Sequence, residues 1–181
     1  LEEEAVPPES TDRRGPRPTI VRCADANQQI NYLVERIIEL CQGMHCRPGD
    51  IGVLARKRET VRELSFRLKN AGIPTVHFRN RDFDVFENQV KVITLNSAKG
   101  LEFPVVFVAD LVEGALPRYL HAADEDEEQA ELRGERRLAY VRMTRAARRL
   151  FLVTYDAPAS RFLGEIDPST VRRKTYPETV S

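Results

Sequence analysis

The most informative feature of this sequence is a missing one, because none of its 9 glycines is followed by lysine. The phosphate-binding loop G-x-x-x-x-G-K-[ST] is therefore absent. P-loop enzymes need that loop, together with a carboxylate that helps to hold Mg²⁺, to bind the β- and γ-phosphates of a nucleotide. The chain by itself is therefore not predicted to hydrolyse nucleotides, unless it carries a phosphate loop of an unrecognised kind.

Net charge, long apolar runs and paired cysteines are also lacking. Lys and Arg together number 28, and so do Asp and Glu, so the overall basic charge typical of a free-standing nucleic-acid-binding domain is absent and any nucleic-acid contact is expected to be local. No apolar run approaches the length of a membrane-spanning helix and no secretory signal opens the chain, so we expect a cytoplasmic protein without a membrane partner. The first residue is Leu1 rather than Met, which indicates a shortened or processed chain.

A metal site is not expected either. Cys41, His45 and Cys46 lie close together in the sequence, but they lack the ligand spacing of zinc sites. We interpret them as the end of a helix with buried thiols. The number of cysteines, three, is odd, which also argues against a disulfide framework.

Strand-like and helix-like segments alternate through the middle of the chain. Short runs rich in Val, Ile and Leu predict strands at 18–24, 50–55, 75–78, 90–95, 104–110 and 150–155. Apolar residues at helical spacing predict helices at 27–42, 59–71 and 129–147. This alternation predicts an α/β fold in three layers with a mainly parallel sheet. We expect one domain over residues 18–166, between a disordered or linker segment at 1–17 and a polar tail at 167–181.

Polar residues follow three of the predicted strands directly. Arg56 comes after one strand, residues 96–100 (NSAKG) after another, and Asp110 after a third. In open parallel sheets, ligands bind outside the carboxyl ends of the strands, because loops and helix N-termini meet there. These three groups are therefore predicted to lie at one edge of the sheet.

Arg145 is a further candidate for a functional site. It follows Leu138 and Val141 at spacings of three and four residues, so it is predicted to share their helical face and point toward the sheet. A guanidinium in that position needs an anion, because an unpaired buried charge is costly. The alternatives are an internal salt bridge to Glu102 or Asp110, or simple exposure to solvent.

Several segments together resemble a known family. Residues 92–107 (VITLNSAKGLEFPVVF) resemble motif V of UvrD/Rep/PcrA-type superfamily 1 helicases, and residues 135–146 (ERRLAYVRMTRA) resemble motif VI. Residues 53–56 (VLAR), with the helix that leads to residue 74, resemble motif IV, and residues 160–166 resemble the end of the motor core. The matches follow the order of the family's motifs. The resemblance implies a RecA-like domain, the second of the two motor domains, which lacks a P-loop of its own.

The resemblance also implies a division of labour at an ATP site shared by two domains. Arg56 and Arg145 are expected to contact the γ-phosphate, with Arg145 as the arginine finger that stabilises the transition state. Glu102 is expected to accept a hydrogen bond from the ribose. Gly100 is expected to let the backbone approach the nucleotide, because it has no side chain.

Thr94 and Asn96 are expected to face single-stranded DNA, whose phosphates accept hydrogen bonds from such side chains. The chain departs from the family at Ala55, where an aromatic residue is common, at Asn96, where His is usual, and at Arg142, where a small residue is usual. Only a short interval, residues 74–90, occupies the place where UvrD and Rep insert an accessory domain.

The expected function is that of a C-terminal motor domain in an ATP-dependent 3′ to 5′ DNA helicase or translocase, with a role in DNA repair. ATP with Mg²⁺ is the expected cofactor of the complete protein, and this chain alone is expected to bind none tightly. The expected partners are a P-loop-containing first motor domain and single-stranded DNA. The alternative is a stand-alone module that binds single-stranded DNA or a protein partner without catalysis.

Overall fold

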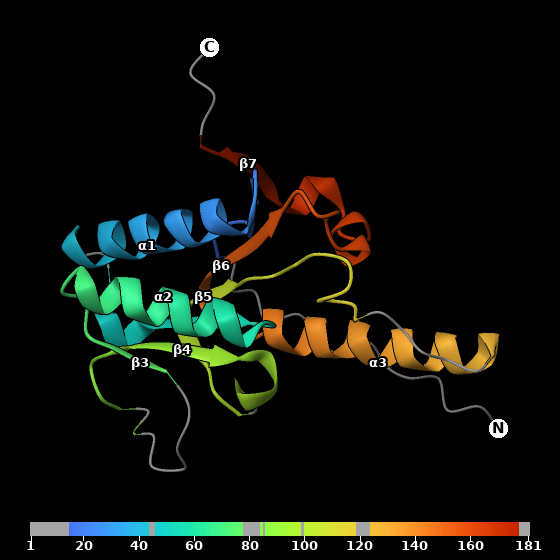
Figure 1. The fold of residues 1–181 in the computed structure, drawn as a ribbon, viewed down its shortest axis with the longest axis horizontal. Coiled ribbons are helices and arrows are strands. Elements are labelled where there is room, and N and C mark those ends of the chain that lie inside the picture. The colour runs from blue at the N-terminus through green and yellow to red at the C-terminus, as the bar shows by residue number, and fades with distance from the viewer. Residues whose placement is uncertain are drawn as a thin grey trace.

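The computed structural model describes residues 15–43, 46–77, 84, 86–98, 100–118 and 124–177. Within these ranges, seven parallel strands form one sheet in the order β3-β4-β2-β5-β6-β1-β7 (Figure 1). The strands are β1 (Thr19–Cys23), β2 (Ile51–Ala55), β3 (Thr75–His77), β4 (Val90–Thr94), β5 (Phe103–Val108), β6 (Ala146–Tyr155) and β7 (Arg172–Tyr176). The α-helices are α1 (Ala26–Gln42), α2 (Arg58–Asn70) and α3 (Glu125–Met143). The predicted α/β fold with a parallel sheet is confirmed.

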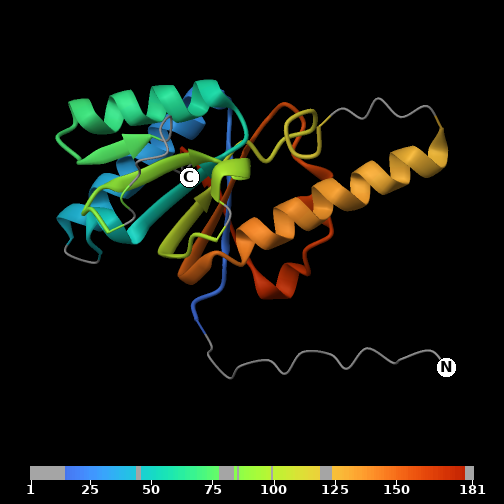
Figure 2. The same cartoon turned by 90° about the horizontal axis from the view of Figure 1, so that it is seen from below.

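Helices cover both faces of the sheet, and each face has its own hydrophobic core. Successive residues of a strand point to opposite faces, so Val53 packs toward α1 and α2 while Leu54 packs toward α3. The first core includes Leu33 of α1 and Leu64 of α2, and the second includes Ala139 of α3. Figure 2 shows this three-layer arrangement, with α2 and α3 on opposite sides of the sheet.

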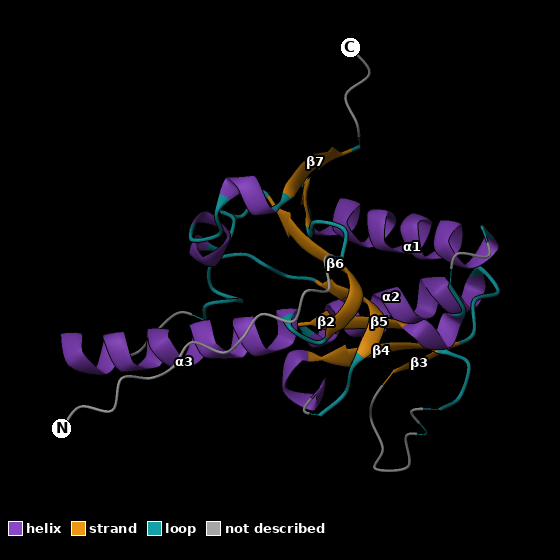
Figure 3. Cartoon of the chain, turned by 180° about the vertical axis from the view of Figure 1, so that it is seen from behind, coloured by secondary structure: helices purple, strands orange, loops and turns teal. Residues whose placement is uncertain are grey.

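The two longest helices differ in how much of their length is packed. In α1, the Asp25 side chain caps the N-terminus by accepting a hydrogen bond from the backbone N–H of Gln28, and one face is buried along most of the helix. Asp124 caps α3 in the same way, but only Ala139 and Arg142 of that helix are buried. The N-terminal half of α3 therefore projects from the molecule (Figure 3). None of the described helices is long and apolar enough to cross a membrane.

The region after residue 166 differs from the sequence-based expectation. Instead of a polar tail, Arg172–Tyr176 form β7, which pairs in parallel with β1 along its whole length. The ring of Tyr176 packs edge-on against that of Tyr32, with 5.4 Å between ring centroids. Residues 1–14 of the predicted linker lie outside the described residues.

The boundary between α3 and β6 also differs from the prediction. The helix ends at Met143 rather than near residue 147, and β6 begins at Ala146 rather than at residue 150. The change occurs because Phe103, at the start of β5, donates a backbone hydrogen bond of 3.0 Å to the carbonyl of Arg145. Because of this contact, β6 begins earlier in the chain than its local sequence favours.

Candidate functional site

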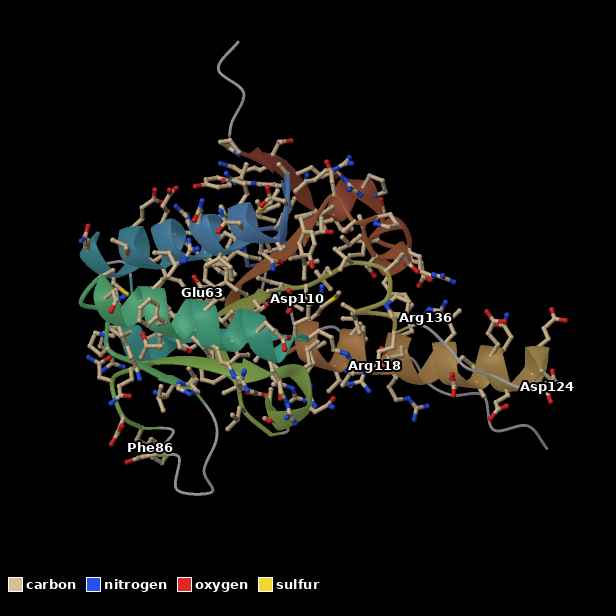
Figure 4. All side chains as sticks on the ribbon, viewed as in Figure 1. Glu63, Phe86, Asp110, Arg118, Asp124 and Arg136 are labelled. Carbon is tan, nitrogen blue, oxygen red and sulfur yellow. The ribbon has the colours of Figure 1, made fainter. Side chains whose placement is uncertain are left out.

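Asp110 organises the carboxyl edge of the sheet. Its carboxylate is fully buried and accepts hydrogen bonds from the Gln29 amide (2.9 Å), the Thr60 hydroxyl (2.9 Å) and the backbone N–H groups of Arg56 (3.1 Å) and Lys57 (2.8 Å). The carboxylate therefore caps the start of α2, where unpaired N–H groups and the helix dipole favour a negative charge. Figure 4 shows Asp110 near the centre of the molecule. The sequence prediction that residues 56 and 110 meet at one edge is correct.

The Arg56 side chain is directed inward by this arrangement, and two of its nitrogens donate to the protein. Its Nε donates to the carbonyl of Ala115 (2.9 Å), and its Nη2 donates to both carboxylate oxygens of Glu135 in α3 (2.9 and 3.1 Å). The backbone N–H of Arg118 donates to the same carboxylate (3.2 Å). The Arg56 side chain is 6% exposed, so this is a buried ion pair whose partners depend on each other.

Arg145 and Glu102 lie elsewhere, at the start of β5 and β6. The Arg145 Nη1 is 3.8 Å from the Glu102 Oε1, and the Glu102 side chain is 71% exposed. The Arg145 Nε donates to the carbonyl of Val141 (3.1 Å). The salt bridge to Glu102 considered from the sequence is thus present but long and solvated, and such pairs contribute about 0 to 1 kcal/mol. The other partner considered, Asp110, is engaged with Gln29 and the start of α2.

The two candidate arginines do not meet in this conformation. Glu135, which holds Arg56, lies eight residues before the end of α3 at Met143, a rise of roughly 12 Å, and Arg145 follows two residues beyond that end. The resemblance implied that Arg56 and Arg145 contact one γ-phosphate. The structure places them in two separate environments, one at each end of the packed half of α3.

The segment between β4 and β5 carries the remaining predicted residues. Thr94 and Ser97 share a hydrogen bond of 2.9 Å between their hydroxyls, and Asn96 is exposed within the short 3-10 helix η2 (Leu95–Ala98). Gly100 has a φ of +80°, and no atom lies within 4 Å of the position that a β-carbon would occupy. The left-handed backbone, rather than crowding, therefore favours glycine there. Thr94 and Asn96, predicted to contact DNA, lie at one end of this segment, and Gly100 and Glu102, predicted to contact the nucleotide, lie at the other.

Sequence reasoning missed three residues that organise these sites. It assigned no role to Gln29 or Glu135, which contact Asp110 and Arg56 across 81 and 79 positions of sequence. It noted Arg142 as unusual but did not predict that the side chain is buried. Position in the chain offers no signal for Gln29, whereas Glu135 opens the segment that resembles motif VI.

A cleft of about 570 Å³ lies away from all of these residues, between α1 and the strands β1, β6 and β7. Its walls carry basic, acidic and tyrosine side chains, among them Arg36, Arg149, Arg172, Glu35 and Tyr176. None of the predicted site residues lines it. The described part of the chain contains no group of three or more His, Cys, Asp or Glu side chains placed to hold a metal ion, and His45 of the cluster considered above lies outside that part.

Solved structures with the same architecture define the class of the fold. The C-terminal domain of a possible DNA helicase from Lactobacillus plantarum superposes with a TM-score of 0.61 and 20% identity, covering 90% of this chain and 88% of that one. Mss116p, solved with ssRNA and AMP-PNP, superposes with a TM-score of 0.59 and 17% identity, covering 90% of this chain and 33% of that one. The fold is therefore that of RecA-like helicase C-terminal domains.

Sequence comparison gives a family match over part of the chain. The family model of the UvrD-like helicase C-terminal domain matches residues 77–157. Over 97 residues the chain is 44% identical to the ATP-dependent DNA helicase PcrA of Leuconostoc citreum, covering 48% of this chain and 12% of PcrA. Over 109 residues it is 38% identical to DNA helicase II of Escherichia coli, covering 54% of this chain and 14% of that protein. Residues 77–157 are therefore similar to the UvrD-like helicase C-terminal domain, and the chain spans about an eighth of the length of these relatives.

Proposed function

We propose that this chain is the second motor domain of an ATP-dependent helicase or translocase that moves 3′ to 5′ on single-stranded DNA. The observation that carries the proposal is the match of residues 77–157 to the UvrD-like C-terminal domain, because that stretch contains Arg145 together with every residue of the β4–β5 segment. The missing P-loop fits the same proposal. ATP and Mg²⁺ would be held by a first motor domain, and this domain would complete the site from the opposite side.

Arg145 is the proposed arginine finger of that shared site. The ion pair that it forms within the described part of the chain is long and involves an exposed carboxylate, so little interaction is lost when the guanidinium turns to a phosphate. Glu102 is proposed to accept a hydrogen bond from the ribose, a role that its exposed side chain permits. Gly100, with its left-handed backbone, is proposed to bring the main chain close to the nucleotide.

Arg56 is proposed to reach the γ-phosphate only in a different conformation. Its ion pair with Glu135 has to open first, since the side chain is buried and its Nε and Nη2 already donate to Ala115 and Glu135. Closure of the two motor domains around ATP would supply the competing anion, and reopening after hydrolysis would restore the pair. Glu135 is in this view the residue that holds Arg56 between cycles.

Thr94 and Asn96 are the proposed contribution of this domain to the DNA track. Hydroxyl and amide groups such as these hydrogen-bond to phosphate oxygens and position a strand without reading its sequence. Because the chain has no net charge, the isolated domain should bind single-stranded DNA weakly and with a marked dependence on salt.

The proposal is tested by Arg145→Ala in the complete protein. An arginine finger acts mainly in the transition state, so DNA-stimulated ATP turnover should fall by about 10³- to 10⁵-fold while nucleotide binding changes far less. The melting temperature of the 181-residue chain should stay nearly unchanged, because the ion pair that is lost is solvated. Arg22→Ala is the matched control, since Arg22 also pairs with a single exposed carboxylate, that of Asp156.

Two results would reject the arginine-finger assignment. One is near-normal turnover of the complete Arg145→Ala protein. The other is a chain that melts many degrees lower after the substitution, which would make Arg145 a structural residue. Near-normal turnover would favour the alternative of a binding module without a catalytic part.

A further inference from the structure

Arg142 is a buried cation for which the described residues supply no partner. It lies in the last turn of α3, is 6% exposed, and has a buried Nε for which no described residue supplies an acceptor. Buried charges in proteins are normally paired and hydrogen-bonded, as Arg56 is with Glu135. The C-terminal end of a helix favours positive charge, but it gives the Arg142 Nε no hydrogen bond here. The position of this side chain therefore calls for an anion that the described residues do not supply.

A second arginine lies next to it. Arg145 follows by three residues and continues the turn, with its backbone N–H donating to the carbonyl of Arg142 (3.2 Å). Burial, and next the charge of Arg145, lower the pKa of Arg142, so the protein itself disfavours this pair of like charges. Glu102 is the carboxylate that pairs with Arg145, at 3.8 Å, and it is mostly exposed. Of the two guanidiniums, only that of Arg145 thus has a carboxylate partner among the described residues, and this pair is weakly held.

The surroundings of this pair belong to the segment already described. The C-terminal part of α3 packs against η2 and β5, so Arg142 and Arg145 lie beside the chain that carries Asn96, Gly100 and Glu102. Two adjacent guanidiniums match the geometry of a phosphate group, because each presents planar N–H donors that can bind two oxygens at once.

We propose that Arg142 and Arg145 together form a phosphate-binding pair, in which Arg142 is a phosphate-contacting residue at a position where related helicases usually have a small side chain. The proposal deepens the proposed function and rests on it for the role of Arg145. The phosphate has two sources in a motor of this kind, the nucleotide and the backbone of the single strand. Both present the same chemistry to an arginine pair.

The first experiment measures binding of inorganic tripolyphosphate to the 181-residue chain by its effect on thermal melting, at constant ionic strength set with NaCl. Arg142→Met keeps the length and apolar stem of the side chain and removes the charge. We expect the variant to bind tripolyphosphate about tenfold more weakly. Without ligand, it should melt no lower than the unmodified chain, because an unpaired buried charge has been removed.

Arg133→Met is the matched control. Arg133 is an exposed residue of the same helix, and nine residues at 100° each place it on the face opposite Arg142. The control should bind tripolyphosphate like the unmodified chain. Unchanged binding by Arg142→Met, or an equal loss in the control, would overturn the proposal.

A second measurement covers the case in which Arg142→Met does not fold. In the unmodified chain, the side-chain Nε–H resonance of Arg142 should shift as tripolyphosphate is added, while that of Arg133 should stay in place. An Arg142 resonance that does not move would reject the site.

The source of the phosphate is decided by repeating the titrations with ATP and with a fifteen-nucleotide oligothymidylate. The ligand whose affinity falls in Arg142→Met, and not in Arg133→Met, is the one that uses the pair. This outcome is separable from the proposed function. If Arg142 binds phosphate but the complete Arg145→Ala protein keeps its turnover, the arginine finger fails and the phosphate site stands; the reverse result removes the phosphate site alone.

Discussion

At the scale of single residues, the buried side chain of Asp110 connects α1 and α2 to the carboxyl end of β5. It has a φ of 60°, a conformation that few residues other than glycine adopt, and Asp is among the residues that tolerate it best. The unusual backbone turns the carboxylate back to the start of α2, where it meets the donors of Gln29 and Thr60. The position of Arg56 depends on this contact, because Asp110 holds its backbone N–H.

Asp110→Ala should therefore be strongly destabilising. The substitution removes the acceptor of several buried donors at once and leaves them without partners, for which a loss of about 3 kcal/mol is expected. For a chain of this size the melting temperature should fall by roughly 10 °C, measured by circular dichroism or calorimetry. Asp156→Ala is the control, because Asp156 forms an exposed ion pair with Arg22 and should change stability by less than about 1 kcal/mol. Equal effects of the two substitutions would contradict this account of Asp110.

At the scale of secondary-structure elements, two glycines show how position decides the effect of one added methyl group. In β2, a β-carbon at Gly52 would lie 2.3 Å from the ring of Phe103 in the neighbouring strand β5. In α3, Gly134 has open space around it. The sheet needs glycine at residue 52, and the helix does not need it at residue 134.

Gly52→Ala and Gly134→Ala should change stability in opposite directions. The first forces the buried ring of Phe103 aside, at a cost of about 1 to 3 kcal/mol. The second replaces a poor helix former by a good one at an exposed position and should stabilise the chain by up to about 1 kcal/mol. Urea unfolding of both variants measures the two changes. Two losses of similar size would show that packing between β2 and β5 does not set the effect.

The elements also show which parts of the fold local sequence can predict. Among the buried central strands, β2 carries a continuous apolar run and β4 a mostly apolar one, and their observed bounds lie within one residue of the predicted ones. The β7 strand carries no such run, because it lies at the edge of the sheet with most side chains exposed and pairs on one side only. Its existence depends on β1, which lies about 150 positions earlier in the sequence.

The candidate site, like the fold, could be predicted from the sequence only in part. Arg56 and Asp110 could be brought together from the sequence, because both follow parallel strands and such ends share one edge. The ion pair of Arg56 with Glu135 could not, because it depends on how α3 crosses the sheet. The same crossing keeps Arg56 apart from Arg145. The order of the motifs in the sequence does not predict this separation.

At the scale of the whole molecule, the proposed ATP site requires a first motor domain in addition to this chain. We expect the isolated 181-residue chain to show no ATP hydrolysis above background, with or without single-stranded DNA, because it lacks the loop that binds the β- and γ-phosphates. A phosphate-release assay tests this, with the complete protein as the positive control. Turnover that copurifies with the isolated chain and disappears in Arg145→Ala would contradict the two-domain site.

The basic residues of β7 have a consequence for the behaviour of the molecule in solution. An open sheet ends in strands whose outer N–H and C=O groups can pair with another chain, which is a route to aggregation. At one edge of the described sheet, β3 is described over three residues, and at the other, β7 exposes Arg172, Arg173 and Lys174 in succession. A second copy that added its own β7 there would bring like charges face to face across neighbouring strands, where they repel. The run of basic residues that makes β7 hard to recognise in the sequence thus also disfavours the addition of a strand from another copy of the chain.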